Sequence, residues 1–228
     1  MQGFIHYVKD HKDSEKQAKV SFDSFKKHGY DVELKEGITP DTIHNYPKYD
    51  VLAGSRLESF LVNDKNERKH LVKKSCVMNN ITFAKRVIDQ NKPLLFLEHD
   101  SIAVNPIDNL DFDEFCYLAI ETWNKPPSTL RHKHSRYDFP YKKGVQDFPE
   151  NWPVIYHRKT RYLGSKLTPG TIAYALSPKG AKKLVEAVEK YGLEQSDFII
   201  NSHVLRLQYV FPALVKHQQV NLNLSHKL

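Results

Sequence analysis

An apolar run that ends in acidic residues constrains the fold of this chain more than any other feature. Residues 93–97 read Pro-Leu-Leu-Phe-Leu, and Glu98, His99 and Asp100 follow directly. The run has the length and composition of a strand buried inside an α/β sheet. Ligands of open α/β sheets bind beyond such strand ends, so these polar side chains stand where a site is expected.

Glu98 and Asp100 suit a divalent cation. Positions two apart in an extended chain point to the same side, which brings both carboxylates together. Carboxylate oxygens are preferred ligands of Mg²⁺ and Mn²⁺, and these cations hold nucleotide phosphates. The common glycine-rich phosphate-binding motifs are absent from the sequence, so a metal–carboxylate route to phosphate is the main one left. The alternative is a strand followed by a solvated acidic turn.

Strands and helices alternate along the chain, which predicts an α/β architecture. We expect the pair Asn79-Asn80 to interrupt the longest helix. Predicted strands cover residues 3–8, 31–34, 93–97, 115–120, 171–176 and 208–211, and predicted helices cover 14–28, 68–90, 178–191 and a short stretch from 196.

The composition is that of a globular protein. The chain has 228 residues, of which 40% are hydrophobic and 27% charged, and this predicts one domain over residues 1–228. No apolar run is long enough for a transmembrane segment, and the N-terminus does not read as a signal peptide. Cys76 and Cys116 form no disulfide framework, so we expect a cytoplasmic protein, in the host cytoplasm if it is viral.

Residues 122–168 show no clear period and read as a long irregular insertion rich in basic and aromatic residues. Between 125 and 166 there are ten Lys or Arg and three acidic residues, a net +7 that equals the excess of the whole chain. A local basic patch predicts an anionic partner, which could be a nucleic acid, a phosphorylated glycan or a membrane surface, and rings interleaved with the cations are typical of nucleic-acid binding. The candidate cations for this partner are Arg131, Lys133, Arg136, Lys142, Lys143, Arg158 and Arg161, and the interleaved rings are Tyr137, Phe139, Tyr141, Trp152, Tyr156 and Tyr162.

A second block carries a family resemblance. Residues 170–188 read GTIAYALSPKGAKKLVEAV, and SDFII follows at 196–200. With Cys76 and the acidic triplet at 98–100, these motifs resemble the nucleotide-sugar glycosyltransferases of family 25, which are lipopolysaccharide-type enzymes with collagen-modifying relatives and small phage-borne members. The resemblance is weak over residues 3–35, clearer over 70–105 and 168–217, and most specific at 170–184. The family often has Ser-His at Asn79-Asn80, and commonly Asp in place of His99.

The resemblance implies a GT-A-like fold, a mixed sheet flanked by helices, and a nucleotide-sugar donor. Asp100, assisted by Glu98, would hold Mn²⁺ or Mg²⁺ on the donor diphosphate, and Asp197 stands where the general base of an inverting transfer would lie. Asp197 could equally be an acid favoured by a helix N-terminus. The remaining residues implied are His99, Gly170 and Thr171 for the donor, and His203 and His217 for the metal, although a lone histidine is more often structural.

The acceptor stays open between a hydroxymethylated base in phage DNA, which we favour, and a lipopolysaccharide or other surface glycan. Two functions of another class remain: a metal-dependent nuclease, which also uses paired carboxylates, and a non-catalytic nucleic-acid-binding module. Binding of UDP-type nucleotides only in the presence of Mn²⁺ would distinguish the transferase from both.

Overall fold

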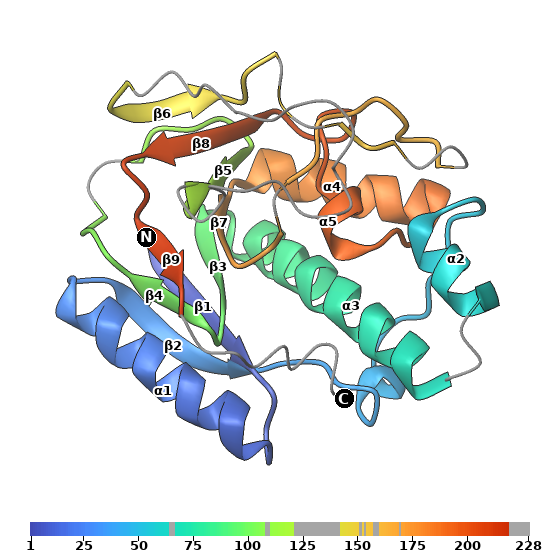
Figure 1. Cartoon of the computed structure of the whole chain (residues 1–228), viewed down its shortest axis with the longest axis horizontal. Helices are drawn as coiled ribbons and strands as arrows, with labels where there is room; N and C mark the ends of the chain where they lie inside the picture. The colour runs from blue at the N-terminus through green and yellow to red at the C-terminus, as the bar shows by residue number, and fades with distance from the viewer. Residues whose placement is uncertain are drawn as a thin grey trace.

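The computed structural model describes residues 1–63, 67–107, 110–120, 142–150, 152, 154–156, 160–168 and 170–218. Its centre is a mixed seven-stranded sheet (Figure 1). Across the sheet the strands are β2 (Asp31–Glu36), β1 (Gln2–Tyr7), β3 (Leu94–Glu98), β7 (Ala173–Leu176), β5 (Phe115–Tyr117), β8 (Leu207–Phe211) and β6 (Gly144–Asp147).

Because β1 and β3 pair in parallel, their carboxyl ends lie side by side at the same end of the strands. Strands β2, β1 and β3 are parallel neighbours, and β5 is parallel to β8. Strand β7 runs antiparallel to both β3 and β5, and β6 runs antiparallel to β8. His6 pairs with Glu98, so the carboxyl ends of β1 and β3 open onto the same space.

Helices cover both faces of the sheet. In Figure 1, α3 and α4 lie together on one side and α1 lies on the other, beside the two-stranded ribbon of β4 and β9. No helix in the described part of the chain is both long enough and apolar enough to cross a membrane. The helices are α1 (Lys12–Lys27), the 3₁₀ turn η1 (Ile43–Asn45), α2 (Arg56–Asn63), α3 (Glu67–Gln90), α4 (Pro178–Tyr191) and α5 (Ser196–Ile199); the ribbon strands are β4 (Ser101–Ala103) and β9 (Val215–His217).

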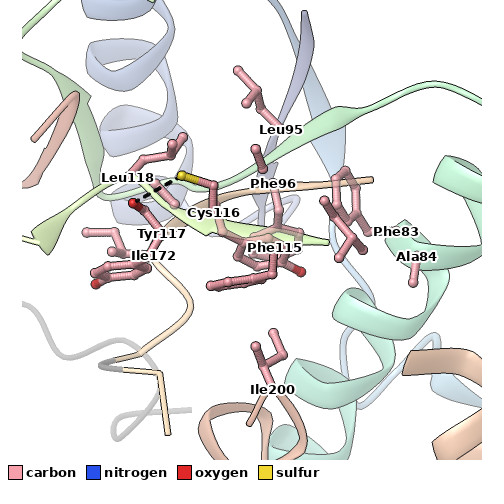
Figure 2. Packing of buried hydrophobic residues seen from close by; sticks show 14 of the residues in the cluster. Phe83, Ala84, Leu95, Phe96, Phe115, Cys116, Tyr117, Leu118, Ile172 and Ile200 are labelled. Atoms are coloured by element: carbon pink, nitrogen blue, oxygen red, sulfur yellow. Dashed lines mark hydrogen bonds between the residues drawn. The ribbon is translucent and has the colours of Figure 1, made fainter. Parts of the chain in front are cut away.

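Aromatic side chains join α3 to the centre of the sheet. Phe96 of β3 stacks on Tyr174 of β7 with ring centroids 4.9 Å apart, and Phe115 of β5 lies 5.1 Å from Tyr174. Phe83 of α3 meets the Phe96 ring edge-on at 5.4 Å. Figure 2 shows this packing around the strands, where the labelled side chains are fully or almost fully buried. Burial of such rings makes a large hydrophobic contribution and fixes α3 relative to β3.

The predicted α/β architecture is confirmed as a mixed sheet flanked by helices, but α3 is unbroken. Asn79 and Asn80 do not interrupt it, because their side-chain amides donate to carbonyls one turn back, Ser75 and Cys76, within the helix. Their carbonyl oxygens accept hydrogen bonds from elsewhere in the fold. A carbonyl oxygen has two lone pairs, so it can accept the side-chain amide and the helical N–H at the same time.

The predicted insertion is less irregular than its sequence indicates. Residues 144–147 form β6, which extends the sheet at β8. Trp152 is 3% exposed and donates a hydrogen bond to the Leu167 carbonyl, and Tyr162 is fully buried. These two rings belong to the hydrophobic core, so they are not available to stack on a base or a sugar. Residues 121–141, which hold the first half of the basic stretch, lie outside the described residues.

Candidate active site

A cavity of about 350 Å³ opens where β1 and β3 end. Its walls come from the last residues of both strands, the loop at 37–40, α3, and the segments 170–171 and 195–197. Separate stretches of chain from both halves of the sequence therefore meet around one space. The volume is within the range of small-molecule sites in proteins.

Glu98 is held in this cavity by Thr171. The Thr171 hydroxyl donates to Glu98 Oε1 over 2.7 Å, and the Glu98 backbone N–H donates to the Ile172 carbonyl. Burial, followed by the charge of Asp100, raises the pKa of Glu98 to about 8, and the Thr171 hydrogen bond opposes that rise. In the absence of a cation this carboxyl group is therefore largely protonated at neutral pH. A divalent cation would favour its ionised form.

Asp100 has one carboxylate oxygen without a partner among the described residues. Its Oδ1 is buried and accepts no hydrogen bond from them, while Oδ2 lies 3.4 Å from His217 Nε2 on β9. The Asp100 carbonyl accepts from the Gln218 backbone N–H at 2.7 Å, which fixes the turn. A buried acceptor without a donor is unfavourable unless a cation or a proton satisfies it.

These features fit a divalent cation that completes its shell with ligand oxygens. Among the described residues, no three His, Cys, Asp or Glu side chains are arranged to hold a metal ion on their own. Mg²⁺ commonly uses one or two carboxylates together with substrate phosphates. Glu98 and the free Oδ1 of Asp100 match that minimal protein contribution.

Asp197, on α5, also lines the cavity. Its carboxylate accepts no hydrogen bond from any described residue, and the N-cap position of α5 makes no side-chain capping bond. Burial raises the pKa of Asp197 to about 6, while the positive charges of Arg56 and Lys73 act to lower it. A carboxylate without a capping contact and with a pKa near neutrality has the properties of a general base.

Asn79 and Asn80 line the cavity, but their side-chain amides are hydrogen-bonded to other parts of the protein. Asn79 Oδ1 accepts from the Ile38 N–H at 2.7 Å, and its Nδ2 donates to the Ile38 carbonyl at 3.1 Å. This pair of bonds clamps the 37–40 loop onto α3. Asn80 Oδ1 accepts from the buried Tyr174 hydroxyl at 2.7 Å. Both side chains are thus occupied by protein partners.

Glu194 anchors the segment that carries Asp197. Its fully buried carboxylate accepts from the backbone N–H of Arg56, Leu57 and Gln195, and from the Thr160 hydroxyl. The bonds to Arg56 and Leu57 satisfy free N–H groups at the start of α2. One carboxylate therefore ties α2 and the 160 segment to the α5 wall of the cavity.

The structure brings together all the residues predicted to bind the donor, and Asp197 with them. His217 lies beside Asp100, whereas His203 is exposed and does not line the cavity; its ring is 5.9 Å from that of Tyr162. Gly170 has a φ of +90°, in the region that favours glycine. Their roles stay predictions. The predicted donor residues in the cavity wall are Glu98, His99, Asp100, Gly170 and Thr171.

The predicted acceptor-binding cations are only partly placed. Lys142 and Lys143 are exposed next to β6, and Arg161 lies with its guanidinium carbon 3.3 Å from the centroid of the Tyr191 ring. None of these three lines the cavity. The other four lie outside the described residues: Arg131, Lys133, Arg136 and Arg158.

Lys73 and the end of β1 line the cavity without having been predicted from the sequence. His6 and Tyr7 reach it because β1 and β3 are parallel neighbours, so their carboxyl ends coincide. The strand pattern at 3–8 was a signal for these two residues. No local signal indicated Lys73, which reaches the site only because α3 packs beside β3.

No protein-family model matches the chain, and no curated protein matches it. Among similar solved structures is galactosyltransferase LgtC in complex with donor and acceptor sugar analogues, with 12% identity, coverage of 97% of this chain and 88% of that chain, and a TM-score of 0.44. Another is a glycosyltransferase involved in glycosylation of the major capsid of PBCV-1, with 10% identity, coverage of 99% and 96%, and a TM-score of 0.37. At such identities the roles of individual residues must come from the geometry of the cavity.

Proposed function

We propose that the protein is a glycosyltransferase that moves a sugar from a nucleotide-diphosphate donor to a hydroxyl group of an anionic acceptor. The observation that supports this most is the cavity shared by Glu98, Asp100 and Asp197. It combines a carboxylate pair at a strand end with a separate carboxylate that accepts no hydrogen bond from the described residues. The motif resemblance at 170–188 supports the same reaction.

In this proposal Glu98 and Asp100 hold Mn²⁺ or Mg²⁺, with His217 beside Asp100. The cation supplies Lewis-acid stabilisation of the donor diphosphate when it is bound. Thr171 keeps the Glu98 carboxylate oriented through its hydrogen bond, and the Gln218 contact fixes the Asp100 turn. The buried Oδ1 of Asp100, which has no partner among the described residues, would be satisfied by that cation.

Asp197 then acts as the general base. It accepts the proton of the acceptor hydroxyl while that oxygen forms a bond to the anomeric carbon of the sugar. The bond from this carbon to the diphosphate oxygen breaks, and its electron pair leaves with the nucleotide diphosphate. One displacement of this kind inverts the anomeric configuration, so we propose an inverting enzyme.

For the acceptor we propose a hydroxymethylated base in phage DNA, with a surface glycan as the alternative. Support comes from the +7 excess between residues 125 and 166 and from the exposed Lys142 and Lys143. A polyanion would be attracted to this segment without base-specific contacts. Because Trp152 and Tyr162 are buried, the support comes from charge more than from stacking.

The first experiment is a thermal-shift panel of nucleotide-sugars with and without Mn²⁺. A donor at 100 times its Kd stabilises the native state by about 2.7 kcal/mol, which raises the Tm of a protein of this size by roughly 5–10 °C. We expect the shift only when Mn²⁺ is present. The Asp100→Asn variant should keep the wild-type Tm without ligand and lose the shift.

Asp23→Asn, an equal change at an exposed position of α1, is the matched control and should behave as wild type. A wild-type protein that gains no stability from any nucleotide-sugar, but cleaves DNA or binds it without nucleotides, would favour the nuclease or the binding module instead. Full metal-dependent binding by Asp100→Asn would contradict the assignment of the cation to this carboxylate.

A further inference from the structure

Lys73 is a lysine in the wall of the cavity, whose acidic lining residues are Glu98, Asp100 and Asp197. It lies on α3 one turn before Cys76 and two turns before Asn80, positions that share one helix face, and all three line the cavity. Its Nζ is 4.2 Å from the centroid of the Phe60 ring on α2. This cation–π contact restrains the long side chain, so the ammonium group stays beside the cavity.

The charge of Lys73 is not neutralised within the described residues. No described carboxylate comes within the 4.0 Å of Nζ that defines an ion pair, and the side chain is half-buried. Burial lowers the pKa of Lys73, and the charge of Asp197 only partly opposes this effect. A poorly hydrated ammonium without an anion is unfavourable, and an anionic ligand would remove that penalty.

We propose that Lys73 binds the phosphate groups of the donor diphosphate, from the α3 wall and separately from Glu98 and Asp100. This inference rests on the proposed function and specifies the part of the ligand that lies against α3. The ionised carboxylates around the cavity repel a diphosphate, so a cation on the α3 wall favours placing the phosphate charge on that side. Lys73 also offsets the negative charge that remains on the diphosphate when the sugar leaves.

The test is calorimetric titration of inorganic pyrophosphate, UDP and uridine, each with excess Mg²⁺. We expect Lys73→Met to weaken pyrophosphate and UDP binding about 10- to 100-fold, the range for loss of one charged hydrogen bond, and to leave uridine binding unchanged. Lys73→Gln, which also removes the charge but stays polar, should show the same loss and keeps the test informative if the methionine variant does not fold. Lys73→Arg, which keeps the charge, should retain most of the affinity.

Lys74→Met is the matched control, because it removes the same charge from the next position of α3, which does not line the cavity. Wild-type affinity of Lys73→Met for pyrophosphate would overturn the inference while leaving a metal-dependent transferase intact. Lys73-dependent pyrophosphate binding without any nucleotide-sugar shift would support the phosphate site and overturn the transferase. A wild-type protein that binds neither pyrophosphate nor UDP would overturn both.

Discussion

At the scale of single residues, the carboxylates of the cavity differ in what surrounds them. Glu98 is fixed by the Thr171 hydroxyl. Asp100 Oδ1 is buried without a partner among the described residues, and Asp100 Oδ2 lies beside His217. Asp197 has no hydrogen-bond partner among the described residues, and only the charges of Arg56 and Lys73 favour its ionised form. Surroundings of this kind suit the proposed division, in which Glu98 and Asp100 hold a cation and Asp197 exchanges a proton.

Asp197→Asn should lower kcat by about 10²- to 10⁴-fold with little change in donor affinity, because a base acts mainly in the transition state. In the wild type, kcat should fall as the pH drops through about 6, where the Asp197 carboxylate becomes protonated. Transfer rates measured from pH 5 to 8 check this, with Asp89→Asn on the exposed end of α3 as control.

Stability distinguishes this role from that of a helix cap. The folded-state pKa of Asp197 is raised from 3.8 to about 6, so the stability that this group contributes is present at low pH and lost as the pH rises through 6. Removing the ionised carboxylate should therefore raise the stability of Asp197→Asn at pH 8, on the order of 1 kcal/mol. A drop in Tm together with reduced donor affinity would identify a structural cap.

At the scale of elements, the start of α4 packs closely against the backbone of Glu114, the residue before β5. Ser177 caps the helix by accepting from the Gly180 N–H, and its own N–H donates to the Glu114 carbonyl at 3.0 Å. The Glu114 carboxylate is 2% exposed and pairs with Lys179 and Lys183 on α4. Because α4 directly follows β7, this fit also sets the position of the 170–171 wall of the cavity.

Gly180→Ala should destabilise the protein by about 1–3 kcal/mol. A Cβ at this position would overlap the Glu114 carbonyl group, whose carbon would lie 2.9 Å away, and backbone cannot give way as a side chain can. Chemical denaturation measures the effect. Lys182→Ala, an exposed change on the same helix, should stay within about 0.5 kcal/mol of wild type. Equal stability of the two variants would show that α4 does not approach Glu114 so closely.

At the scale of the whole molecule, acidic side chains meet in the cavity, and the basic excess lies in one segment of the sequence. Three carboxylates gather in the cavity, while the net excess of +7 arises between residues 125 and 166. The described part of that segment adds β6 to the edge of the sheet beside β8. The exposed Lys142 and Lys143 next to β6 suit the proposed polyanion, and the carboxylates of the cavity suit the proposed cation.

Binding to DNA should therefore depend strongly on salt. With about four lysine or arginine side chains on DNA phosphates, raising the salt from 50 to 200 mM should weaken binding by roughly two orders of magnitude. Changing both Lys142 and Lys143 to Glu should make the slope of the log–log plot less steep, by about 0.9 for each phosphate that is no longer neutralised. Fluorescence anisotropy on DNA with and without hydroxymethylated pyrimidines measures this.

The same charge reversal at Lys16 and Lys19, two exposed residues of α1, is the control and should leave the slope unchanged. If the wild type does not bind DNA at 50 mM salt, the surface-glycan acceptor becomes the better proposal. Arg161 is unsuitable for this test, because its stacking on Tyr191 makes any substitution a packing change as well.

Local patterns of the sequence predicted most of the helices and strands, and they also predicted the carboxylate pair of the site. The periodicity of apolar residues predicted β1, α3, β3, β7 and α4, and the acidic triplet after β3 identified the carboxylate pair, because both signals lie within a few neighbouring residues. The Ser177-Pro178 start and the Gly192 end of α4 were readable for the same reason.

Only the tertiary structure showed which residues from other segments surround that carboxylate pair. Thr171 bonds Glu98 across 73 positions, His217 approaches Asp100 from β9, and Lys73 enters the cavity because α3 packs on the sheet. The choice of parallel neighbours for β1 and antiparallel neighbours for β7 is likewise non-local. Contacts between distant segments depend on how whole faces pack together, and no short stretch of sequence carries that information.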